Sequence, residues 1–309
     1  MRTIYLFVLL SYLLSACNST PSNESPVSNT SEERQKEDIK QAEVPPTKKP
    51  PKEDKPAVGD SQKPFNASIE GYYVGMFDAK EYKENKRPSY SNKITFSIDS
   101  LSENKIFGHS IVAGNMRPFE GEFAHKNGVI TTTCKEPGDD KYDGVFRFNV
   151  FTKTDKIEGT WESYDTNLAV TKRSYNLGKR GFSYDSKLEL PEKVSFNGMY
   201  DSYDMENRIV ERPTKDVLTL NASAQLLKKV DVENMYKADL EIIRNSIYAR
   251  HGYSFKNRRM RYVFDDYVDW YMPIKTNILA DLTELEKKNI ELLKRYEGHA
   301  EKYYDTFGR

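Results

Sequence analysis

The sequence predicts an α+β protein of several parts: an antiparallel β meander that closes into a barrel of about eight strands, followed by a small all-α domain. Residues 69–177 hold eight short runs of alternating apolar and polar residues, separated by turn signals. From Ala222 onward the apolar residues recur at helical spacing instead. Consecutive strands joined by short turns pair antiparallel most simply, and a meander of this size can close on itself without exposed edges.

The N-terminal segment, residues 1–16, has the make-up of a secretory signal peptide. Met1 and Arg2 supply a positive start, and the run Ile4–Leu14 is apolar except for Ser11. This run is too short for a transmembrane helix, which needs about 20 apolar residues. We therefore expect the chain to be exported.

The signal ends at Leu14-Ser15-Ala16-Cys17, which resembles the lipobox of bacterial lipoproteins. The resemblance implies that the Cys17 thiol is acylated and that Cys17 becomes the first residue of the mature chain, anchored to a membrane by lipid. The alternative is an ordinary signal peptide with a cysteine there by chance. Asn18 is not the aspartate that retains some lipoproteins in the inner membrane, which favours the outer membrane. With Cys17 lipidated, Cys134 has no disulfide partner, and we expect it to be a buried small side chain.

Residues 17–64 are expected to be the lipidated cysteine and a disordered tether. The segment is rich in Ser, Asn, Pro, Lys and Glu, so it cannot bury enough apolar surface to offset the entropy of ordering. As a flexible coil it would span roughly 35–40 Å. The whole chain has 47 basic and 47 acidic residues, so no global field draws it to nucleic acid, which we exclude as a partner.

The β domain is expected over residues 65–181. Its predicted strands are 69–76, 93–98, 105–112, 118–125, 128–134, 144–152, 156–163 and 168–177. Three of them share the pattern apolar, any residue, Gly, any residue, aromatic, as in Phe119–Phe123. A glycine inside a strand permits close approach of a neighbouring side chain or a sharp coil.

This glycine pattern resembles, in style only, the strands of lipocalin-like and avidin-like barrels, and no diagnostic motif of either family is present. A small eight-stranded barrel can hold one ligand in its mouth, and some of the aromatic side chains of these strands would then line a ligand cup. The alternative, which we favour, is that these aromatics form the core. The side chains concerned are Tyr72, Phe96, Phe123, Phe146, Phe148 and Trp161.

A connector is expected over residues 182–225, with a short hairpin in which Phe196–Tyr200 pairs with Asp216–Asn221. The helical domain is expected over residues 226–309. Its first helix runs from Lys237 to His251 and ends at Gly252, a position suited to a left-handed turn.

Two further helices follow in the helical domain. The second is expected over Lys256–Asp265, with Met260 and Phe264 among its apolar residues. The last begins at Thr283, which forms a capping box with Glu286.

The string Ile243–Phe255 contains Tyr248-Ala249-Arg250-His251-Gly252 and resembles the signature of the YARHG domain. The similarity continues through Trp270-Tyr271 and Leu282–Asn289 and departs at Met272-Pro273. The family occurs in exported bacterial proteins, so the resemblance implies export and a helical fold. It implies no established activity.

Basic residues are concentrated around this signature. A binding face for phosphate or carboxylate groups is one interpretation, and an internal clasp in which Arg244 and Arg250 pair with Asp265, Asp266 or Asp269 is the alternative. The candidate binding residues are Arg244, Tyr248, Arg250, His251, Tyr253, Arg258, Arg259 and Arg261.

No catalytic or metal-binding residue and no cofactor is predicted. His109 and His125 lack a second ligand at metal spacing. We expect a non-catalytic lipoprotein that binds an envelope polymer or an envelope protein. The alternatives are an envelope hydrolase or enzyme accessory that uses His251, and a small-ligand carrier that uses the barrel.

Overall fold

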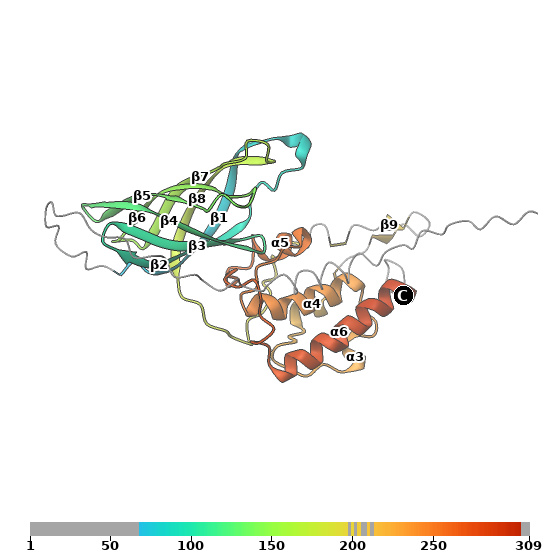
Figure 1. The fold of residues 1–309 in the computed structure, drawn as a ribbon. Coiled ribbons are helices and arrows are strands. Elements are labelled where there is room, and N and C mark those ends of the chain that lie inside the picture. The colour runs from blue at the N-terminus through green and yellow to red at the C-terminus, as the bar shows by residue number, and fades with distance from the viewer. Residues whose placement is uncertain (1–67, 197–198, 201–202, 205–208, 211–212, 304–309) are drawn as a thin grey trace, which may run out of the picture. The chain divides into compact units, whose positions relative to one another are not determined.

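The computed structural model describes residues 68–196, 199–200, 203–204, 209–210 and 213–303. The expected signal peptide, Cys17 and the tether lie outside the described residues. Two parts can be followed in Figure 1: a closed β-barrel and a C-terminal group of helices.

The barrel is an eight-stranded antiparallel meander in which each strand pairs with its sequence neighbour and β1 pairs with β8. This confirms the predicted fold class. The strands are β1 (Gly71–Tyr82), β2 (Lys93–Ser102), β3 (Lys105–Val112), β4 (Asn115–Lys126), β5 (Val129–Lys135), β6 (Gly144–Phe151), β7 (Lys156–Ser163) and β8 (Val170–Arg180). A short 3₁₀ helix, η1 (Glu84–Lys86), lies between β1 and β2.

The barrel interior is filled by alternate side chains of its strands. Phe96 stacks on Phe119 with ring centroids 4.3 Å apart and meets Phe146 edge to face at 5.1 Å. Gly108 lies under the Phe119 ring, and a Cβ there would be 2.5 Å from it. The expected close approach at a strand glycine is therefore present. Cys134 is fully buried among these residues, as predicted.

The connector differs from the expectation. Asp216–Thr219 is the short helix α2 and not a strand, so its predicted pairing with Phe196–Tyr200 is wrong. The hairpin in this region joins β9 (Tyr203–Asp204) to β10 (Ile209–Val210). Elements of two to four residues are too short to show a period, so the sequence pattern could not separate strand from helix here.

The helical region is built around α4 (Lys237–Arg250), in which every residue from Ala238 to Arg250 is buried. It packs against the long α6 (Glu284–Tyr303), as Figure 1 shows. The shorter helices are α3 (Lys229–Val232) and α5 (Arg258–Phe264). The expected apolar stripe Leu240, Ile243 and Ile247 is buried, but the polar faces of α4 are buried as well.

Helix α4 ends as predicted. Gly252 adopts φ +75°, its N–H bonds to Ala249 O at 3.0 Å, and the N–H of Tyr253 bonds to Tyr248 O at 3.1 Å. This pair of bonds is a Schellman motif, which satisfies carbonyls that the helix leaves open. Helix α5 starts later than expected because Asn257 caps it by accepting from the N–H of Arg259.

Candidate functional site

A cavity of about 440 Å³ lies at one end of the barrel. Its wall residues come from the β1–β2, β3–β4, β5–β6 and β7–β8 connections and the strand ends beside them, and Lys256 and Arg261 join them from the helical region. A cavity of this size is in the range of small-molecule sites.

The walls of this cavity are basic. Among the described residues that line it there are six basic side chains and one acidic one. They are Lys86, Arg87, Arg117, Arg173, Lys256 and Arg261, with Glu136 as the acid. The arrangement favours an anionic occupant.

Arg173 is the buried cation on the barrel side. Its Nη1 donates to Phe77 O at 2.7 Å and its Nη2 to Ser89 O at 2.9 Å, and the guanidinium lies 5.1 Å from the Phe77 ring centroid. The pKa of Arg173 is lowered to about 10, mainly by burial. The charge of Asp78 opposes this lowering and the charge of Arg261 adds to it. An anion in the cavity would stabilise the charged guanidinium.

Arg261 is the corresponding cation on the helical side. Its Nε donates to Asn92 Oδ1 at 3.2 Å, and its Nη1 donates to the carbonyls of Phe255 and Lys256. Burial lowers its pKa, Asp265 opposes this, and the charge of Arg258 lowers the pKa again. Two arginines from distant parts of the chain are thus held at one cavity, with their charged forms disfavoured by burial.

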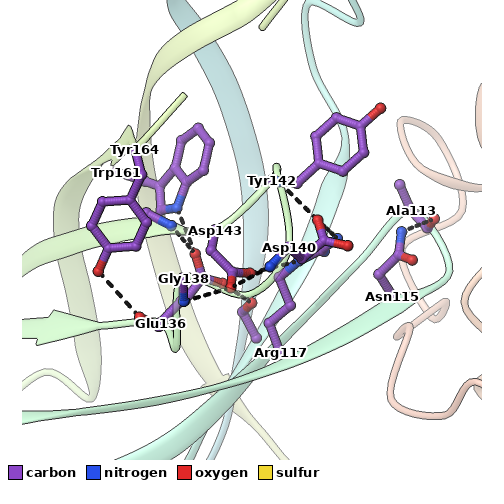
Figure 2. A network of polar contacts seen from close by, with 12 residues as sticks. Ala113, Asn115, Arg117, Glu136, Gly138, Asp140, Tyr142, Asp143, Trp161 and Tyr164 are labelled. Carbon is purple, nitrogen blue, oxygen red and sulfur yellow. Dashed lines mark hydrogen bonds and ion pairs between the residues drawn. The ribbon is translucent and has the colours of Figure 1, made fainter. Parts of the chain in front are cut away.

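Glu136, just after β5, is the acid of the cavity (Figure 2). Its Oε2 accepts from the N–H of Gly144 at 2.8 Å and from Nε1 of Trp161 at 2.9 Å. Burial raises its pKa to about 7, against the lowering effect of these hydrogen bonds and of the Arg117 charge. The carboxyl group therefore changes charge near neutral pH.

Arg117 is held in place by two carboxylates (Figure 2). Its Nε lies 3.2 Å from Asp143 Oδ1, and its Nη2 lies 3.3 Å from Asp140 Oδ1. Asp143 is itself buried and accepts from the N–H of Gly138 at 2.8 Å. Local acids therefore balance the charge of Arg117.

The apolar part of the cavity is aromatic and aliphatic. It is formed by Phe77, Phe146, Trp161, Leu168 and Val170, with Phe77 and Trp161 in edge contact at 5.8 Å. Phe96 and Phe148 fill the interior and do not line the cavity, while Tyr72 and Phe123 are only partly buried. The two interpretations of the aromatics thus each describe some of them.

Of the residues that the sequence proposed for binding, only Arg261 lines this cavity. Arg244 is buried and makes a bidentate pair with Glu297, with Nε–Oε1 at 2.6 Å and Nη2–Oε2 at 3.0 Å. Arg250 is buried and donates from Nε to Leu188 O at 2.7 Å. Both have the internal contacts of a clasp, but their ion-pair and carbonyl partners are not Asp265, Asp266 or Asp269.

The histidine of the signature is also buried. His251 Nε2 lies 2.8 Å from Glu286 Oε2, and its ring stacks on Tyr184 with centroids 4.3 Å apart. It has the carboxylate partner that a general base needs, but it does not open onto the cavity.

The remaining proposed residues lie around the signature. Tyr248 and Tyr253 are each 9% exposed and contact each other edge to face. Arg258 donates to the carbonyls of Arg87 and Pro88, at 3.2 and 2.9 Å, and Arg259 donates to Met199 O at 3.1 Å.

Sequence reasoning missed Glu136 and Arg173, although a signal for each exists. Ile130, Thr132 and Cys134 face inward along β5, and the same alternation continued by two residues reaches Glu136. In β8, Arg173 shares its inward direction with Tyr175 and Leu177. Charged residues are rarely buried, so one at an inward position of a barrel strand indicates a site inside the barrel.

Hydrogen bonds between the barrel and the helical region lie beside the cavity. Asp265 Oδ2 accepts from the N–H of Lys93 at 2.9 Å, and Lys93 Nζ donates to Val268 O at 3.0 Å. The pKa of Asp265 is raised to about 7 by burial, with Lys93 and Arg261 acting against this. These bonds join the start of β2 to the end of α5.

Fold and site together define an α+β protein with a ligand-sized basic cavity at the mouth of a filled barrel. Residues 215–298 match the family model of the YARHG domain, so the chain contains a YARHG domain, as its signature indicated. The match begins before residue 226, where the sequence placed the domain, and includes α2. No curated protein matches the chain.

The YARHG domain is typical of secreted or periplasmic proteins. Within the described part of the chain, no helix is long and apolar enough to cross a bilayer.

Proposed function

We propose that this protein is an exported, lipid-anchored binding protein of the bacterial cell envelope that holds a small organic anion in the cavity of its barrel. The observation that supports it is the excess of basic over acidic side chains around a cavity of about 440 Å³. The expected class, a non-catalytic envelope binding protein, is kept. The proposed binding residues are those that line the barrel mouth, in place of the residues around the signature that the sequence predicted.

The ligand combines an anionic head with an apolar body. Carboxylate or phosphate suits the guanidinium groups of Arg173 and Arg261, because each carries five N–H donors and does not use all of them in its bonds to the protein. The wall formed by Phe77, Phe146 and Trp161 suits a compact ring or branched aliphatic group. Phe96 and Phe148 fill the barrel below, so a long tail has no room there.

The proposal is tested with a pair of ligands that share one apolar body and carry charged groups of opposite sign. The chain has two tryptophans, and only Trp161 lines the cavity, so Trp270→Phe leaves a single reporter at the site. The full chain with this change, in dodecyl maltoside, is titrated with adamantane-1-carboxylate, adamantan-1-amine and inorganic phosphate while Trp161 emission is followed. Empty micelles serve as the blank.

We expect saturable binding of the carboxylate, at least about tenfold tighter than the amine, and weaker binding of phosphate because it lacks the apolar body. Arg173→Gln should weaken the carboxylate. The matched control is Arg147→Gln, an exposed arginine on β6 whose side chain pairs with Glu162 outside the cavity. Equal affinities for carboxylate and amine, or no saturation with either, would refute an anion site.

An envelope polymer or envelope protein is a further proposed partner, and the basic stretch provides its test. Arg258→Glu/Arg259→Glu changes two arginines outside the cavity, and Arg261→Glu changes one inside it. Retention of the full chain on purified sacculi should fall in the first variant if the surface binds a polymer. It should be unaffected in both if binding is confined to the small ligand.

The hydrolase alternative has less support. His251 is 4% exposed and covered by the Tyr184 ring, so a substrate cannot reach it without local opening.

A further inference from the structure

The segment that follows the YARHG signature reaches the barrel. Ser254 lies two residues beyond Gly252, and its Oγ accepts from the N–H of Gly114, in the β3–β4 turn, at 2.9 Å. Both atoms are buried. The next residues along the segment include Lys256 and then Arg261, which line the cavity.

This segment is held on its other side by the helical region. The N–H of Ser254 donates to Lys275 O at 2.8 Å, and the N–H groups of Ile274 and Lys275 donate to Gly252 O at 2.8 and 2.9 Å. A Cβ on Gly252 would lie 2.5 Å from the Ile274 side chain, so the two strands of chain are in close contact.

Apolar packing continues the contact between barrel and helical region. Met272 and Ile274 form a buried cluster with Val74 and Ile111 of the barrel. The signature turn therefore lies in a chain of contacts that ends at the barrel wall, and it is not a free surface.

We propose that the YARHG domain completes the anion-binding cavity: its signature turn positions the following segment so that Lys256 and Arg261 close the mouth of the barrel. The inference rests on the proposed function and adds to it a role for the signature. His251 and Arg250 are then positioning residues, buried behind the segment, and the ligand contacts come from Lys256 and Arg261. The barrel alone would keep Lys86, Arg87, Arg117 and Arg173 but would lose this side of the cavity.

Two glycines allow a matched test. Gly114 and Gly128 both occupy two-residue turns at positive φ, +78° and +81°, so alanine introduces the same backbone strain at each. A Cβ at Gly114 would lie 2.1 Å from Lys256 Cγ and 2.9 Å from its backbone N, whereas at Gly128 the nearest atom is 3.5 Å away. Only Gly114→Ala displaces the segment.

The measurement is the adamantane-1-carboxylate titration on the full chain with Trp270→Phe. We expect Gly114→Ala and Lys256→Met each to weaken binding by about tenfold, and Gly128→Ala to bind as the parent does. Ser254→Ala, which leaves the Gly114 N–H without its acceptor, should weaken binding in the same direction. Circular dichroism melts run alongside show whether each variant is folded, and Lys256→Met tests the contact if Gly114→Ala fails to fold.

The outcomes separate this inference from the proposed function. If the parent binds and both Gly114→Ala and Lys256→Met bind equally well, the cavity is complete without the YARHG segment and the inference is wrong. If Gly128→Ala weakens binding as much as Gly114→Ala, turn strain is the cause and the inference again falls. If the parent itself does not bind, the anion site is the statement that fails.

Discussion

His251 of the signature and Glu286 of helix α6 are joined inside the protein, with His251 Nε2 2.8 Å from Glu286 Oε2. The same Oε2 accepts from the N–H of Thr283 at 2.9 Å and from its hydroxyl at 3.1 Å, and Thr283 Oγ1 accepts from the N–H of Glu286 at 3.2 Å. The predicted capping box is thus confirmed, and its glutamate also holds the signature histidine. The end of α4 and the start of α6 share one carboxylate.

The first prediction concerns this shared carboxylate. Burial would raise the pKa of Glu286, but the hydrogen bonds from His251 and Thr283 lower it to about 2. A folded-state pKa below the ordinary value of 4.5 gives stability that is present above pH 4.5 and is lost as the pH falls towards 2. We expect Glu286→Gln to reduce the free energy of unfolding by about 3 kcal/mol at pH 7, measured by urea titration.

Its control is Glu284→Gln in the same helical turn, where the carboxylate is exposed and pairs with Lys287. The Lys287 hydrogen bond lowers the pKa of Glu284, but the pair is exposed, so that variant should keep most of the parent's acid sensitivity. An unchanged acid slope in Glu286→Gln would contradict the assignment.

The second prediction concerns the buried pair between α4 and α6. Arg244 is 1% exposed, and its Nε and Nη2 both donate hydrogen bonds to the carboxylate of Glu297. Removal of one partner leaves a buried charge, so Arg244→Met or Glu297→Gln should each cost about 3–5 kcal/mol of unfolding free energy. The double variant should cost less than the sum of the two, since neither Arg244 nor Glu297 is then left without the other.

A matched control lies on the same two helices. Lys237 Nζ and Glu301 Oε1 are 2.7 Å apart, and their side chains are 34% and 51% exposed, against 1% and 12% in the Arg244–Glu297 pair. Lys237→Met should change stability by less than about 1 kcal/mol. Losses of similar size in Lys237→Met and Arg244→Met would show that burial does not govern the pair.

The third prediction is a pH dependence at the cavity. Since burial raises the pKa of Glu136 to about 7, the folded state binds more protons than the unfolded one between pH 4.5 and 7, and stability falls as the pH rises through this window. Glu136→Gln should remove this slope and raise the unfolding free energy by about 2 kcal/mol at pH 8. The control is Glu162→Gln, an exposed residue of β7.

Protonation of Glu136 should also change the affinity for the anionic ligand. Below pH 7 the neutral Glu136 no longer repels an anion, so affinity for adamantane-1-carboxylate should rise as the pH falls from 8 to 6. A pH profile that is identical in the two proteins would argue against Glu136 as its origin.

The fourth prediction concerns the N-terminus, which lies outside the described residues. Cys17→Ser should abolish incorporation of labelled palmitate and move the chain from the membrane fraction to the soluble exported fraction. Cys134→Ser is the control, because that thiol is buried in the barrel and burial raises its pKa to about 11. Label that persists in Cys17→Ser would rule out the lipobox interpretation.

The sequence by itself determined those features that depend on local pattern. Alternation along each strand predicted the meander, because one face of every strand points to a common core. The end of α4 at Gly252 followed from one residue that tolerates positive φ, and the capping box from the spacing of Thr283 and Glu286. The signature string Ile243–Phe255, with Trp270-Tyr271 and Leu282–Asn289 after it, was enough to identify the YARHG domain.

Only the tertiary structure decided which distant side chains meet. The partner of Arg244 is Glu297, 53 residues away, because α6 packs along α4, and the nearer aspartates lie at the end of α5 instead. Likewise the cavity brings Arg173 of β8 beside Arg261 of α5. Such pairs depend on how helices and strands pack against one another. The spacing of apolar residues, every two residues in a strand or 3.6 in a helix, holds no information about that packing.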